Sequence, residues 1–232
     1  MSCSAPVRKV IAGGTPWDRP LAQRIRSTYH DETYESMTID HPTLRLHNRH
    51  TGEVLEMWRE RRGEETVLQL RGTLPPHSQG PPLHIHYIED EVGVVVVGVL
   101  SAEVFGQQLT FKQGETVLLP HGLPHRWWNG GDELLRFDGH ILPVADLDRY
   151  LQAIFEVINA GPPNRPSLFY LAHAALQHRR TQTILVMPPA VQAVLFRAIV
   201  AVGTLLGRYR GTEWPGCPAR CTGAPELVAL NT

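Results

Sequence analysis

The sequence has no excess of charge of either sign and very little cysteine. Its 232 residues carry 22 lysines and arginines against 23 aspartates and glutamates, a formal net charge of −1. Dedicated nucleic-acid-binding proteins normally show a strong basic excess, so we expect no nucleic-acid partner. Three cysteines are too few for a disulfide framework. We expect Cys217 and Cys221, close together in the tail, to be free thiols, and a disulfide between them is the alternative.

The sequence also shows neither the pattern of a secretory signal nor a clear membrane span. It does not open on a basic segment followed by an apolar one, so we expect a cytoplasmic protein. The longest nearly apolar run, AVQAVLFRAIVAVGTLLG over residues 190–207, is borderline in length for a span. Gln192 and Arg197 interrupt this run, and its apolar residues recur at helical spacing, which favours a packed amphipathic helix. Membrane association through residues 190–207 is the alternative.

Glycine, proline and histidine are abundant by contrast, with 20, 19 and 12 copies. The prolines and glycines divide the chain into three zones. Residues 1–41 are polar without sustained periodicity, and we expect an N-terminal arm there. Residues 42–143 hold short segments rich in Val, Leu and Thr between turn residues, a pattern typical of a β-sandwich or barrel. Residues 144–232 form a predicted helical C-terminal extension, whose first helix begins near Asp146 and ends at Gly161.

Some of the histidines stand in a spaced pattern within the predicted barrel. His84 and His86 are separated by one residue in a strand-like run, so both side chains point to the same face of the sheet. This pair is weak on its own, but Glu91 follows His86 after four residues and Gly98 follows Glu91 after six. A second segment reads G-x5-P-x-G-x2-H-x3-N, from Gly114 to Asn129, and places His125 near its end.

These two segments resemble the motifs of the cupin superfamily. HIHYIEDEVGVVVVG (84–98) resembles the first motif, and GETVLLPHGLPHRWWN (114–129) resembles the second. One position departs from the pattern, because Ser78 stands where the first motif has its leading glycine, and Gly80 comes two residues later. The resemblance implies a mainly β fold, a cupin-type double-stranded β-helix (jelly-roll) barrel, with one metal inside. By position, His84, His86, Glu91 and His125 match the four metal ligands of the family.

The chemistry of this ligand set is consistent with the resemblance. Three imidazoles and one carboxylate suit a divalent transition metal (Fe, Mn, Ni, Co, Cu or Zn) and leave positions open for other molecules. A lone strand histidine would be better explained as a core residue. Glu89 and Asp90 are the rival carboxylate ligands; both break the family spacing, and we expect them to be solvated.

Alternation along the strands also predicts the lining of the pocket. If Glu91 faces inward, so do Val95 and Val97, and an inward His125 brings Trp127 with it. This lining suits a small, largely apolar or aromatic substrate, although Trp127 is equally well explained as core. His121 stands at a turn, where it is either a surface residue or an acid–base group at the rim of the pocket.

Three functions remain open at this point. The first hypothesis is a metal-dependent oxidoreductase of the dioxygenase type, in which Glu91 also acts as a base. The second is an isomerase, cyclase or lyase that uses the metal as a Lewis acid. The third is a non-enzymatic cupin that binds a metal or a small ligand. A barrel with exposed edges and an apolar C-terminal helix further predicts a homodimer.

Overall fold

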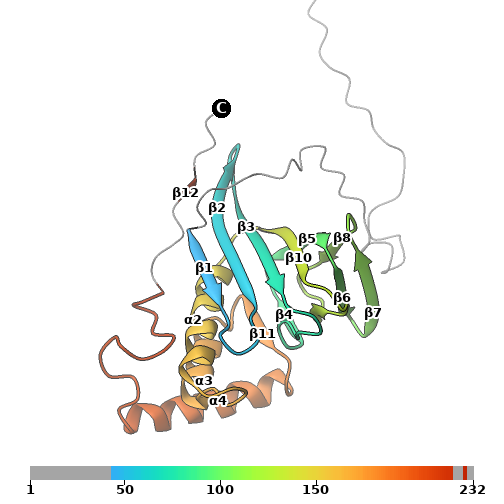
Figure 1. The fold of residues 1–232 in the computed structure, drawn as a ribbon. Coiled ribbons are helices and arrows are strands. Elements are labelled where there is room, and N and C mark those ends of the chain that lie inside the picture. Colours follow the sequence, from blue (N-terminus) through green and yellow to red (C-terminus); the bar gives the residue numbers. More distant parts are fainter. Residues whose placement is uncertain (1–42, 222–226, 229–232) are drawn as a thin grey trace, which may run out of the picture.

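A computed structural model describes residues 43–221 and 227–228 of the chain (Figure 1). The N-terminal arm predicted over residues 1–41 lies outside the described residues. The described chain is mainly β; ten strands come first, and two further short strands accompany the three helices that follow. This arrangement confirms the predicted jelly-roll barrel with a helical C-terminal region.

Two sheets face each other to form the barrel. The first contains, in spatial order, β1 (Leu44–His47), β2 (Val54–Arg62), β3 (Glu65–Leu74), β10 (Leu135–Leu142), β5 (Asp90–Val97) and β8 (Thr116–Leu119). The second contains β11 (Gln182–Ile184), β4 (His84–His86), β9 (His125–Asn129), β6 (Val99–Val104) and β7 (Gln107–Lys112). These neighbours all pair antiparallel, and the short β12 (Leu227–Val228) pairs parallel with β2. β1 to β3 follow one another in the first sheet, and from β3 to β11 the chain alternates between the sheets except at the β6–β7 hairpin.

The core lies between the sheets and follows the expected alternation of strand residues. The largest fully buried apolar side chains are Phe111, Met57, Leu68, Leu74, Leu135 and Ile141. Asn129, the last residue of the second motif, is fully buried, and its side chain connects the end of β3 to the segment before β10 through hydrogen bonds. Its Nδ2 lies 2.8–3.1 Å from the carbonyl oxygens of Leu74, Pro75 and Glu133, and its Oδ1 accepts a hydrogen bond from the Gly131 backbone. The asparagine thus replaces missing strand hydrogen bonds at this corner.

Two glycines explain parts of the motif pattern. Gly98 has a φ of +83°, and a side chain there would lie 2.6 Å from the carbonyl oxygen of Leu134. Gly80 packs so closely against Trp127 that an added Cβ would lie 2.4 Å from its carbonyl oxygen. The loop entering β4 therefore has its close backbone approach at Gly80, two residues after Ser78, where the family pattern has glycine.

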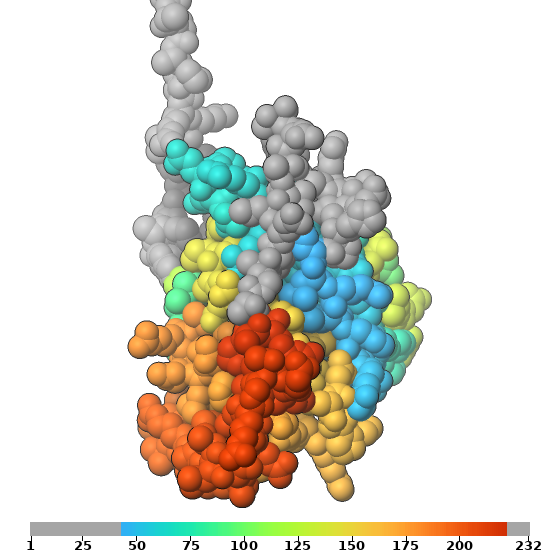
Figure 2. Space-filling model, turned by 90° about the vertical axis from the view of Figure 1, so that its left-hand side faces the viewer, coloured from blue at the N-terminus to red at the C-terminus, as the bar shows by residue number. Residues whose placement is uncertain are grey.

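The helices gather at one end of the barrel, where the C-terminal residues cover the lower part of the face in Figure 2. They are α2 (Leu147–Ala160), α3 (Leu168–Gln177) and α4 (Pro189–Leu205). α2 begins after Asp146 and ends before Gly161, as predicted. Arg59 of β2 fastens it to the barrel through an ion pair of 2.8 Å with the fully buried Asp148.

The last helix differs from its predicted packing. α4 packs against α3, but the residues it buries are Gln192 and Gly203. The stripe expected to be packed is exposed, with Val194 67% and Leu195 42% accessible. Glycine on the packed face lets Tyr209 approach closely, which explains why the small residue rather than the apolar stripe faces inward. No helix within the described part of the chain is long and apolar enough to cross a membrane.

The tail cysteines lie beyond these helices. Cys217 and Cys221 are both buried, and neither forms a disulfide. The free thiols predicted from the sequence are confirmed.

Candidate metal centre

Both sheets contribute to a cluster of three histidines and one glutamate inside the barrel. His84 and His86 point inward from β4, and His125 of β9 pairs in register with His84. Glu91 reaches them from β5 in the facing sheet, with its Oε1 3.1 Å from Nε2 of His86 and its Oε2 4.0 Å from Nε2 of His125. One ligand atom from each of the four residues lies within 4.8 Å of the others. Side chains far apart in sequence therefore converge on one point.

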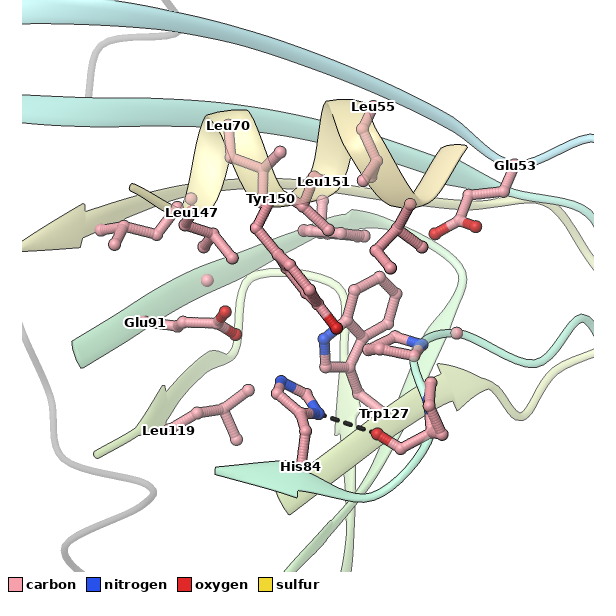
Figure 3. Close-up of a pocket in the computed structure, with 18 of the residues that line it drawn as sticks. Glu53, Leu55, Leu70, His84, Glu91, Leu119, Trp127, Leu147, Tyr150 and Leu151 are labelled. Atoms are coloured by element: carbon pink, nitrogen blue, oxygen red, sulfur yellow. Dashed lines mark hydrogen bonds between the residues drawn. The ribbon is translucent and has the colours of Figure 1, made fainter. Parts of the chain in front are cut away.

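Hydrogen bonds fix which nitrogen of two of these rings faces the cluster. Nδ1 of His84 lies 2.8 Å from the carbonyl oxygen of Pro82, the dashed line in Figure 3, and Nδ1 of His125 lies 2.8 Å from that of Leu123. A carbonyl oxygen only accepts, so each Nδ1 carries the hydrogen. In the neutral ring, Nε2 then presents its lone pair to the cluster, the arrangement that a metal ligand requires.

Burial and mutual charge shape the protonation of the cluster. Burial and the neighbouring histidines lower the pKa of His84 to about 3, and burial likewise lowers that of His125. Burial alone would lower the pKa of His86, but the carboxylates of Glu91 and Glu89 outweigh it and raise the value to about 9. Burial would raise the pKa of Glu91, yet the three histidines bring it down to about 2. The site thus holds two neutral imidazoles beside a buried ion pair.

The donor set fits a divalent transition metal. Within the described residues, Nε2 of His125 is buried and has no hydrogen-bond partner, and the buried Nε2 of His86 faces only the carboxylate of Glu91. Buried nitrogens without partners are costly, and a cation held by three imidazoles and a carboxylate would satisfy them. The cluster can therefore bind a metal, and Glu91 contributes the only negative charge that faces it directly among the described residues.

Glu89 corrects an expectation from the sequence. It was expected to be solvated, but its side chain is fully buried. Its Oε2 lies 3.6 Å from Nδ1 of His86, on the side of the ring opposite Glu91. Its Oε1 accepts hydrogen bonds from the backbone nitrogens of Ala145 and Leu147, at 2.9 and 3.4 Å, where α2 begins. Glu89 thus supplies the carboxylate that accepts hydrogen bonds from the backbone at the start of α2. The side chain of Asp146, the residue before the helix, bonds to His178 instead.

A cavity of about 260 Å³ opens beside the cluster. His84, Glu91 and Trp127 line its inner part, and the buried Trp127 packs edge-on against Phe137. Most of the remaining wall is apolar and includes Leu55, Leu70, Leu119, Leu147, Leu151, Ile154 and Phe155. A cavity of about 150 Å³ is enough to bind benzene, so this one has room for a substituted single ring.

Helix α2 closes the cavity opposite the cluster and brings a polar group into it. Tyr150 reaches down from α2, and its hydroxyl end is directed to the side that carries His84 and Trp127 (Figure 3). Burial raises the pKa of the Tyr150 hydroxyl well above its ordinary value, so the hydroxyl keeps its proton and can donate a hydrogen bond. The Arg59–Asp148 pair and the Glu89 contacts hold the first turn of α2, which sets the position of this tyrosine.

Three of the predicted pocket residues lie elsewhere. Val95 is buried in the core but does not line the cavity, which ends nearer the start of β5, at Val92 and Gly93. Val97 is 36% exposed, because the pairing of β5 with β10 shifts register just before it and breaks the alternation. His121 lies outside the cavity at a turn, with Nδ1 2.6 Å from Asp90.

Other cavity residues escaped the sequence-based reasoning. Glu53, His140 and Tyr150 all line the cavity. Tyr150 and Glu53 lie outside both motifs, on the helix and the loop that close the barrel. The one usable signal for Tyr150 was its helical register with Leu147, Leu151 and Ile154, which face the same cavity.

Comparison with known proteins finds one curated relative and several solved structures that are similar to part of this chain. A protein named oxidoreductase iacF, from Pestalotiopsis fici, is 37% identical over 79 residues, which cover 33% of this chain and 39% of that protein. The chain thus spans well under half the length of this curated relative. Similar solved structures include KdgF from Halomonas sp., with 19% identity, a TM-score of 0.35, and 41% of this chain and 84% of that chain covered. Another is a variant of salicylate 1,2-dioxygenase from Pseudoaminobacter salicylatoxidans, with 21% identity, a TM-score of 0.30, and 32% and 21% covered.

The matched family profile covers the strands that hold the cluster. Residues 70–142 match the family described as "Cupin domain", and this range includes both motifs and all four clustered residues. The resemblance expected from the motifs is confirmed, and the chain contains a cupin domain over residues 70–142.

Proposed function

We propose that this chain is a metal-dependent oxidoreductase of the dioxygenase type that acts on a small, largely apolar or aromatic substrate. The observation that carries the proposal is the direction of the four clustered side chains. His84, His86, His125 and Glu91 converge on one point at the inner end of an apolar cavity. The 37% identity over 79 residues with a protein named as an oxidoreductase supports the reaction class.

Each residue has a defined task in this proposal. The three histidines and Glu91 hold a divalent transition metal, which when bound supplies Lewis acidity and redox chemistry towards dioxygen. The apolar wall excludes water and orients the body of the substrate. Tyr150 donates a hydrogen bond to an oxygen of the substrate. Glu91 acts as the base that accepts a proton from the substrate.

Oxygen dependence separates this proposal from the Lewis-acid alternative. The test incubates the Fe(II)-loaded protein with a panel of small aromatic and alicyclic compounds, and it follows both dioxygen uptake and loss of each compound. We expect uptake that parallels substrate loss and that stops under nitrogen. Substrate loss at an equal rate without dioxygen would assign the site to an isomerase, cyclase or lyase instead.

Two variants control this experiment. His125→Ala removes one histidine of the cluster and is expected to abolish turnover. His121→Ala removes a histidine that lies outside the cavity and is expected to leave turnover unchanged. A folded, metal-loaded protein that consumes no dioxygen with any compound of the panel would contradict the assignment as an oxidoreductase.

A further inference from the structure

The cavity carries a second carboxyl group that the metal cluster does not use. Glu53 stands just before β2 and lines the cavity, although its side chain is only 8% exposed. Figure 3 shows its carboxyl group entering the cavity from the side opposite Glu91, with Tyr150 and Trp127 between them. The cavity therefore has a carboxyl group at its far end as well as the cluster at its near end.

No cation neutralises this carboxyl group among the described residues, where Glu53 forms no salt bridge. Its polar partner is the side chain of Asn48. The Oδ1 of Asn48 already accepts hydrogen bonds from the backbone nitrogens of His50 and Thr51, so its amide NH₂ group is the part left to donate to Glu53. Burial raises the pKa of Glu53 to about 7, and near neutral pH the group exists in both its acidic and its ionised forms.

A purely structural role explains this residue poorly. A buried carboxyl group without a cation costs stability, and Glu53 closes no network that holds two elements of the barrel together, since Asn48 lies in the same β1–β2 connection. The wall between Glu53 and the cluster is apolar, with Leu55, Leu70 and Ile154 among its residues. A perturbed acid that faces such a cavity is a candidate for ligand binding.

We propose that Glu53 binds a hydroxyl group at the end of the substrate remote from the metal. This inference rests on the proposed function, and it narrows the substrate to small hydroxylated ring compounds, such as phenols and ring alcohols. A hydroxyl group both donates and accepts, so it pairs with either form of the carboxyl group. A cation would pair only with the ionised form, and a carboxylate only with the acid. Two polar ends across an apolar wall also fix the direction in which the ligand lies.

The test compares benzoate with 3- and 4-hydroxybenzoate as probes, whose carboxylate serves as the metal-binding end. Binding to the Zn(II)-loaded full chain is measured by titration calorimetry, so that no redox turnover is needed. We expect the better hydroxybenzoate to bind the native protein about tenfold more tightly than benzoate, the usual effect of one added hydrogen bond. In Glu53→Leu the ratio falls to about one, whereas Glu53→Gln keeps most of the preference, because a carboxamide also donates and accepts.

A matched control and a folding check complete the design. Glu56→Leu removes a partly exposed glutamate of the same region and is expected to retain the native preference. Melting curves show whether both Glu53 variants are folded, and the Gln variant preserves the contact to Asn48. A hydroxyl preference that survives in Glu53→Leu would overturn the proposal, and so would equal or absent binding of all three probes to the native protein. Because zinc replaces a redox metal, these outcomes stand apart from whether the chain is an oxidoreductase.

Discussion

Replacing Glu89 by glutamine tests how the buried second carboxylate supports the cluster. In the native chain Glu89 faces Nδ1 of His86 at 3.6 Å, while Nε2 of the same ring faces Glu91. The carboxylate favours a hydrogen on Nδ1 and so leaves Nε2 free for a metal. A glutamine whose Oε1 keeps the backbone hydrogen bonds of Glu89 turns its NH₂ group towards Nδ1. That contact favours the opposite tautomer, with the hydrogen on Nε2.

The expected loss of metal affinity follows from this geometry. Losing such a supporting contact typically weakens metal binding by about 10- to 100-fold. The separation of 3.6 Å is longer than a hydrogen bond, so we expect the lower end, about tenfold or ~1.4 kcal/mol. Alanine would be a poorer choice. It would also leave the backbone nitrogens of Ala145 and Leu147 without an acceptor, at about 1–3 kcal/mol of folding stability each.

The assay is a competition between the protein and a chelator for Co(II), whose visible absorption also reports the ligand geometry. Asp90→Asn is the matched control, since it removes a neighbouring, exposed carboxylate that bonds to His121 instead of a clustered histidine. We expect weakened binding and a changed spectrum in Glu89→Gln alone. Native-like affinity in Glu89→Gln, or an equal loss in Asp90→Asn, would refute the role of Glu89.

Three further outcomes are expected. Asn129→Ala should lower the free energy of unfolding by about 3 kcal/mol in urea titrations, because buried backbone groups lose their partner; a change below about 1 kcal/mol would contradict this. Gly98→Ala should cost about 1–3 kcal/mol in the same titration, given its φ of +83°, and unchanged stability would contradict the strain. We propose a homodimer, with the exposed Val194 and Leu195 of α4 as surface for a second copy to cover. Sedimentation should show a dimer that Val194→Asp weakens, and native monomers alone at micromolar concentration would contradict it.

The barrel and the cluster could be predicted from the sequence because their signals are local. Alternation sends His84 and His86 to one face whatever the rest of the chain does, and the spacing to Glu91 and His125 follows from the strand and turn lengths of the two motifs. The first helix was equally readable, since Asp146 and Gly161 mark its ends. These features depend on residues close together in the chain.

The remaining parts depend on contacts between distant segments, which periodicity does not show. Glu89 is buried only because the start of α2 covers it with the backbone of Ala145 and Leu147. Val97 escaped the expected alternation because the pairing with β10 shifts register there. The side of α4 that packs differs from the prediction, because Tyr209 approaches closely at Gly203 while the apolar stripe stays exposed. The predictions from sequence therefore fail where tertiary packing overrides a local pattern.

The metal content of the purified chain tests the central claim most directly. Elemental analysis of the native protein and of His121→Ala should find about one transition-metal ion per chain, whereas His84→Ala/His86→Ala should retain almost none. Circular dichroism would show that all three proteins are folded. Equal metal content in the native protein and the double variant would contradict the assignment of these residues as ligands.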